Sequence, residues 1–155
     1  MSETGEVRSA ASGFTLIELL VVIAVLALVM AVIPSLLPQV QAKAELSAAA
    51  REVATALREA RGRAIVTAKP ATFVLDTRTG RYGAADARAP HRLPRSVRPT
   101  LVTTTDEQID GDVGAIRFFA DGSSSGGRVT LAGGERTMWV GVDWLTGRVA
   151  VRDKH

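Results

Sequence analysis

The chain has 155 residues, 46% of them hydrophobic, and it carries no cysteine. This length accommodates one domain of ordinary size plus a membrane anchor, and the lack of cysteine excludes a disulfide framework and a thiolate-bound metal. The formal charge of +3 permits contact with nucleic acid or acidic partners but does not require it, because the basic residues are dispersed among Asp and Glu.

An apolar stretch follows the short polar segment 1–12. It runs from Gly13 to Leu37, and no residue between Leu19 and Ile33 is polar. A helix over residues 14–37 would be roughly 36 Å long at about 1.5 Å per residue. Because the hydrocarbon layer of a bilayer is roughly 30 Å thick, the stretch predicts a transmembrane helix.

Glu18 lies inside this apolar stretch. An ionisable side chain costs on the order of 2.5–3.5 kcal/mol in the membrane, so we interpret Glu18 as a functional residue that needs a partner. A secretory signal peptide is the alternative, since Ala42-Lys43-Ala44 offers a suitable cleavage site. The length of the apolar stretch, the position of Glu18 and a leader without a positive start disfavour that reading, and an uncut anchor is a further alternative.

The helical period continues beyond Pro38, which predicts an amphipathic continuation over 38–68. Its apolar face is Leu46, Ala50, Val53, Leu57, Ala60 and Ala64. One helix from Phe14 to Thr67 would be roughly 80 Å long, with Glu59 and Arg63 as an i,i+4 ion pair. A coiled coil is the alternative for the alanine-rich face, although few heptads are present.

Strand patterns replace the helical period after Lys69-Pro70. Residues 71–75, a turn at 76–80 and residues 81–82 predict a hairpin, while the proline-containing segment 84–112 predicts an exposed irregular loop with one short strand near 97–103. From Ala115, a strand at 115–119 and three alternating strands predict a meander. The fold class is therefore α+β, with the long helix packed on an antiparallel sheet in a domain spanning 70–155.

No catalytic or metal site survives inspection of the spacing. His91 and His155 have no suitably spaced serine or carboxylate partner, and Ser123–Gly127 lacks the lysine of a phosphate-binding loop. The acidic residues near 110 do not have the spacing of an EF-hand loop; they are Asp106, Glu107, Asp110 and Asp112. We therefore predict no enzyme activity, no cofactor and no metal.

The run Gly13-Phe14-Thr15-Leu16-Ile17-Glu18 resembles the processing motif of type IV pilins and of the pseudopilins of type II secretion. The resemblance implies that a prepilin peptidase removes residues 1–13 and methylates Phe14. It also implies that Glu18 pairs with the terminal amine of a neighbouring subunit. Leaders of the family tend to be basic, whereas this one has Glu3, Glu6 and Arg8, so the orientation in the membrane rests on the resemblance.

Residues 118–127 and 142–149 resemble the GspH/FimT pseudopilin domain. The resemblance implies a pilin-like fold and a minor pseudopilin in the tip of the periplasmic pseudopilus, which helps to export folded proteins across the outer membrane. The chain would be a single-pass protein of the bacterial inner membrane with its carboxy-terminal domain in the periplasm. The implied partners are prepilin peptidase, minor and major pseudopilins, the inner-membrane assembly platform and secreted cargo.

The FimT branch of the same family gives an alternative, a minor type IV pilin in pilus assembly or DNA uptake. Under that reading, Arg148 and Arg152 near the carboxy-terminus are candidate contacts for DNA or another anion. Both arginines alternate with Val149 and Val151, as outward-facing strand residues do, so a solvated face explains them equally well.

Overall fold

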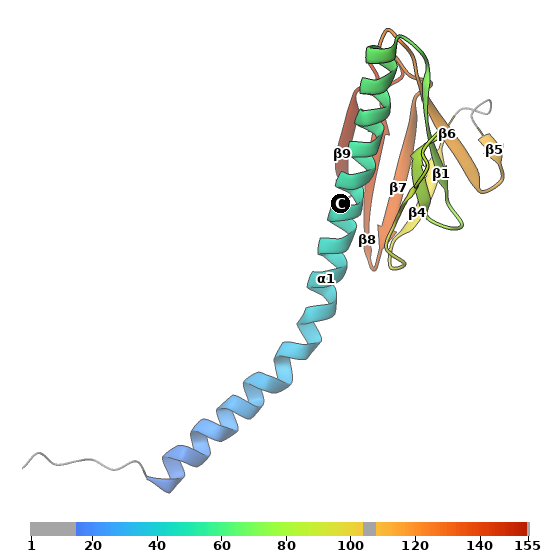
Figure 1. Ribbon diagram of the computed structural model, residues 1–155. Helices are drawn as coiled ribbons and strands as arrows, with labels where there is room; N and C mark the ends of the chain where they lie inside the picture. The colour runs from blue at the N-terminus through green and yellow to red at the C-terminus, as the bar shows by residue number, and fades with distance from the viewer. Residues whose placement is uncertain (1–14, 104–107, 155) are drawn as a thin grey trace, which may run out of the picture. The chain divides into compact units, whose positions relative to one another are not determined.

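The computed structural model describes residues 15–103 and 108–154, and the fold consists of one long helix and two antiparallel sheets (Figure 1). Helix α1 is Leu16–Thr67, which confirms the predicted continuous helix and its end before Pro70. The chain divides into two units, residues 1–38 and 39–155.

The first unit contains the amino-terminal part of α1. The side chains of residues 16–30 are exposed, among them Leu16 and Met30. Within the described residues, no helical segment combines the length and hydropathy that crossing a membrane requires. The span at 14–37 stays a prediction.

The second unit contains both sheets. Among the described residues, the sheets have nine strands. The first sheet has the order β3-β2-β1-β6-β5. Its strands are β1 Ala71–Asp76, β2 Arg81–Ala84, β3 His91–Arg92, β5 Gln108–Asp110 and β6 Val113–Phe118. The second sheet has the order β4-β7-β8-β9. Its strands are β4 Arg98–Val102, β7 Gly127–Gly133, β8 Arg136–Val142 and β9 Val149–Lys154.

The carboxy-terminal part of α1 packs against both sheets to form one core (Figure 1). The six apolar positions predicted for its inner face are all buried, with exposed fractions of 2% or less. Phe73 of β1, Phe118 of β6 and Val140 of β8 are fully buried against them. The predicted α+β class and the predicted meander β7-β8-β9 are confirmed.

Two sequence predictions need correction. Segment 84–112 is exposed over most of its described residues, and its predicted strand near 97–103 is β4, but it is not otherwise an irregular loop, because it also contains β3 and β5 and because Leu93 and Val97 are buried. The predicted pair of Glu59 with Arg63 is wrong, since the Arg63 guanidinium lies 2.7 Å from the Asp86 carboxylate instead. The partners of Arg63 and of strand β4 are distant in sequence, and helical or strand periodicity carries no information about such contacts.

Arg61 connects α1 to the loops at one end of the second sheet. Its Nε donates to the Gly122 carbonyl oxygen at 3.0 Å, and its terminal nitrogen donates to the Thr146 carbonyl oxygen at 2.9 Å. The backbone N–H of Ser124 donates to the Trp144 carbonyl oxygen at 2.9 Å, which joins the two loops to each other. This arrangement fixes the β8-β9 turn relative to the helix.

Candidate functional site

The amino-terminal motif is the first candidate site. Gly13 and Phe14 lie outside the described residues, whereas Glu18 is the third residue of α1 and is exposed. The Glu18 backbone N–H donates to the Thr15 side-chain oxygen at 3.3 Å, so Thr15 caps the helix. The Thr15-x-x-Glu18 spacing is a capping-box signal that our reading of the sequence missed. Glu18 therefore lies at the end of the helix dipole that favours a negative charge.

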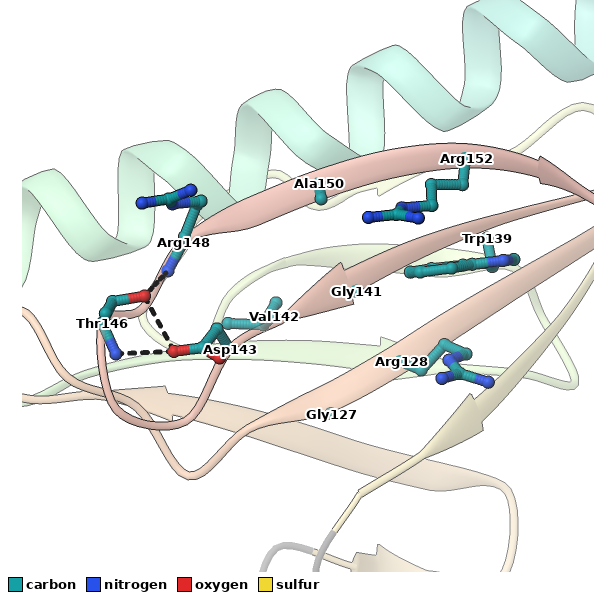
Figure 2. Close-up of a pocket in the computed structure, with 10 residues that line it drawn as sticks. All are labelled: Gly127, Arg128, Trp139, Gly141, Val142, Asp143, Thr146, Arg148, Ala150 and Arg152. Atoms are coloured by element: carbon teal, nitrogen blue, oxygen red, sulfur yellow. Dashed lines mark hydrogen bonds between the residues drawn. The ribbon is translucent and has the colours of Figure 1, made fainter.

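The second candidate site lies on the outer face of the second sheet, around Trp139. Figure 2 shows the indole between the side chains of Arg128 from β7 and Arg152 from β9. The guanidinium carbons lie 4.7 Å and 5.6 Å from the ring centroid, respectively. These distances are typical of cation–π contacts, which Arg makes more often than Lys. The half-buried ring thus holds two positive charges close together at the surface.

Small residues make room for this arrangement. Gly141 lies two residues after Trp139 on β8 and is paired with Ala150 on β9. A Cβ atom added at Gly141 would come within 2.7 Å of the indole Cζ3, so only glycine leaves space for the ring in this position. The result is an open hollow of about 490 Å³.

Arg148 and Arg152, the two candidates from the sequence, line this same hollow (Figure 2). Trp139 alternates with the buried Val140 on β8 and therefore lies on the outer face of the strand. Nothing in the sequence singled out Arg128. The register of the strands brings these residues together, because Arg128 lies opposite Gly141 and Arg152 lies opposite Trp139. The turns at 133–136 and 143–148 set that register. They were the signal in the sequence from which this pairing of residues could have been predicted.

Asp143 closes one end of the hollow. The Thr146 backbone N–H and hydroxyl each donate to its carboxylate at 2.8 Å (Figure 2). These two hydrogen bonds, the backbone one first, hold the pKa of Asp143 below its usual value of 3.8. The carboxylate therefore organises the turn that carries Arg148.

We expect the turn that Asp143 organises to lose stability in acid. Because its pKa is lowered in the folded state, its stabilisation is present above pH 3.8 and is lost as the pH falls through the lower folded value. We expect Asp143→Asn to reduce the dependence of the unfolding free energy on pH in this acidic range. Thr146→Val keeps the backbone donor and should give an intermediate slope. Denaturant unfolding of the full chain at a series of acidic pH values measures both, and equal slopes in all three proteins would contradict the prediction.

Other residues named from the sequence do not form a reaction centre among the described residues. His91 is exposed and its ring stacks on Tyr82 with centroids 5.4 Å apart. Burial, followed by the nearby Glu52 carboxylate, raises the pKa of Tyr82 to about 12. Ser124 has a structural role in the loop, because its hydroxyl donates to the Asp143 carbonyl oxygen at 3.0 Å. Asp106, Glu107 and His155 lie outside the described residues, and the described ones contain no acid or histidine group suited to a metal.

A long amino-terminal helix packed on antiparallel sheets defines a pilin-like α+β protein, and solved structures share this fold. The minor pilin FimU of Pseudomonas aeruginosa matches with a TM-score of 0.56 and 14% identity, over 71% of this chain and 90% of that one. The minor pseudopilin EpsH from the type 2 secretion system of Vibrio cholerae matches with a TM-score of 0.56 and 11% identity, over 70% and 97% of the two chains.

Sequence comparisons identify the family. The family model of the prokaryotic N-terminal methylation motif matches residues 8–34. The model of the family described as "Type II transport protein GspH" matches residues 49–146. Type II secretion system protein H of Xanthomonas campestris is 34% identical over 145 residues, which cover 92% of this chain and 84% of that protein. The chain belongs to the GspH family of type II transport proteins.

Proposed function

We propose that this protein is a minor pseudopilin of a type II secretion system, a subunit of the periplasmic pseudopilus tip that helps to export folded proteins across the outer membrane. The observation that carries the proposal is the 34% identity to a type II secretion system protein H over 92% of the chain. The methylation motif at residues 8–34 and the likeness of the fold to a minor pseudopilin support it.

Processing of the amino-terminus is the first proposed step. Prepilin peptidase cuts after Gly13 and methylates Phe14, so that residues 1–13 are the leader. Residues 14–37 then anchor the mature chain in the inner membrane as a single span, 38–68 continue the helix, and the domain 70–155 lies in the periplasm. The apolar composition of residues 19–33 supports the anchor.

The proposed action is assembly rather than catalysis. Glu18 pairs with the terminal amine of a neighbouring subunit, since a carboxylate and an ammonium attract strongly in low dielectric and either alone is costly. The periplasmic domain then contacts other minor and major pseudopilins, and the inner-membrane platform drives subunit addition. Secreted cargo is a further proposed contact of the tip.

Processing gives a direct test with a matched control. We expect the chain purified from cells that carry the peptidase to lack residues 1–13 and to carry one methyl group at Phe14. Gly13→Val should leave the leader attached, because the peptidase motif is destroyed. Gly5→Val makes the same change within the leader and should be processed normally. Intact-mass measurement decides, and an uncut wild-type chain would contradict the proposal.

Deletion of the gene tests the secretion role. We expect exported proteins to accumulate in the periplasm, and the wild-type gene to restore their release. The FimT-like alternative predicts normal release and a loss of DNA uptake instead. Assays of both processes in the same deletion strain therefore separate the two functions.

A further inference from the structure

The outer face around Trp139 presents more positive than negative charge, because three arginines and one carboxylate, that of Asp143, line its hollow. Among the described residues, neither Arg128 nor Arg152 forms an ion pair, although Arg136 on the same sheet pairs with Asp153 at 3.7 Å. Both free arginines are exposed and share one hollow with Arg148. Three cations gathered on one sheet face attract a negatively charged partner.

The contact with the indole prepares these arginines for carboxylates. A guanidinium that lies against an aromatic ring keeps its N–H donors in its own plane, where they remain available for paired hydrogen bonds. The indole also restricts the side chains, which reduces the entropy lost when they bind a ligand. Arg128 and Arg152 are therefore held beside the ring before any partner arrives.

The floor of the hollow indicates what kind of ligand fits. Ala150 and the edge of the indole that lies over Gly141 offer no polar group there, so an extended protein segment with alternating acidic and small apolar residues matches both the floor and the arginines. Single-stranded DNA matches less well, because guanidinium groups lie 4.7 Å and 5.6 Å from the indole centroid and would have to move before a base could stack on the ring (Figure 2).

From this geometry we infer that the hollow around Trp139 is a docking surface for an acidic, extended segment of a neighbouring pseudopilin subunit. The inference rests on the proposed function, which brings other subunits to this domain. A neighbouring subunit is always the same protein, whereas exported proteins differ in surface sequence. A fixed arrangement of ring, glycine and arginines therefore suits a subunit as its partner.

Fluorescence of Trp139 measures the binding directly. Trp144→Phe in the full chain in detergent leaves Trp139 as the sole tryptophan, and Trp144 is 67% exposed, so the fold should tolerate the change. We expect a capped peptide of alternating glutamate and valine to change the emission in a saturable, salt-sensitive way. The same peptide with glutamine in place of glutamate should not bind. Equal binding of both peptides, or binding of oligothymidine in place of the acidic peptide, would overturn the inference.

Charge-neutral variants test which arginines act. Arg128→Gln with Arg152→Gln should weaken peptide binding by about tenfold or more, since each loses a charge-assisted hydrogen bond. Arg136→Gln removes the same charge from β8 outside the hollow and should leave binding unchanged. A loss as large in Arg136→Gln would show that only net charge matters and would contradict a built site.

Photo-crosslinking in cells identifies the source of the segment. A benzophenone amino acid in place of Thr130, which lies opposite Trp139 on β7, would face the docked partner. We expect a crosslink to another subunit that disappears in the double glutamine variant, while processing at Gly13 stays normal. A crosslink to an exported protein instead would overturn the inference and leave the proposed function intact, because that function is tested separately by processing and secretion.

Discussion

Replacement of Glu18 by glutamine is expected to leave cleavage after Gly13 intact and to prevent the subunit from entering the pseudopilus. Breaking a buried ion pair by neutralising one partner costs about 3–5 kcal/mol, and about 1.4 kcal/mol corresponds to a factor of ten. The incorporated fraction should therefore fall more than a hundredfold. Crosslinking of subunits in isolated membranes measures incorporation, and intact mass measures processing.

The structure suggests a second role for Glu18 that this experiment must separate. Thr15 caps α1 and Glu18 lies in its first turn, so loss of the carboxylate also weakens a favourable interaction with the helix dipole. That interaction is worth only about 0.3–1 kcal/mol. Thr15→Ala removes the capping oxygen at a cost of about 1 kcal/mol and keeps the charge. If capping were the essential role, the threonine variant would fail at least as severely as the glutamine variant.

A matched control lies on the same helix. Glu59 is exposed in the second unit, and Glu59→Gln makes the same chemical change outside the apolar stretch. We expect it to assemble and to support secretion as the wild type does. Normal incorporation of the Glu18→Gln subunit, with correct processing, would contradict the proposed pairing.

Local patterns predicted the helix and its buried face because both depend on residues close in sequence. Lys69-Pro70 ends the helix at Thr67, and the three-and-four spacing from Leu46 to Ala64 identifies the side that packs. The hairpin β1-β2 and the meander β7-β8-β9 follow from alternation and turn residues in the same way. These are the elements whose partners are neighbours along the chain.

The division into two sheets could not be predicted, because it depends on pairing between distant segments. Strand β4 lies between β3 and β5 in sequence, yet it pairs with β7 about 30 residues later, as in Leu101 opposite Val129. Arg61 is a similar case. It looks like a surface residue of an amphipathic helix, whereas its partners are the carbonyl oxygens of Gly122 and Thr146, which no side chain marks in the sequence.

The candidate sites show the same distinction. Glu18 was found because one acid in an apolar stretch is a local anomaly, and Arg148 and Arg152 were found because the FimT-like reading draws attention to basic residues near the carboxy-terminus. Arg128 and Trp139 join them only through the register of three strands. Sequence periodicity gives the face of each strand, but it does not say which residues of neighbouring strands lie opposite one another.

Gly147→Ala is expected to destabilise the carboxy-terminal domain by about 3–4 kcal/mol, because two costs combine at this residue. Its φ of 61° lies in the left-handed region, where a non-glycine residue costs roughly 1–2 kcal/mol. An added Cβ would also overlap the Gly122 carbonyl oxygen and come within 2.8 Å of the Arg61 Nε. The hydrogen bond between those two groups must then break, which costs about 1.5–3 kcal/mol for a charged donor.

Gly134 provides the control, since it has the same φ of 61° but nothing within 4 Å of an added Cβ. Gly134→Ala should therefore cost only the backbone contribution of roughly 1–2 kcal/mol. Arg61→Met keeps the aliphatic stem and removes the hydrogen bonds, so combining it with Gly147→Ala should cost less than the sum of the two changes. Urea unfolding, monitored by tryptophan fluorescence, measures the unfolding free energies of the three single variants and of the double variant relative to the wild type. Equal losses for the two glycine variants would show that the contact between Arg61 and the Gly122 loop does not contribute to stability.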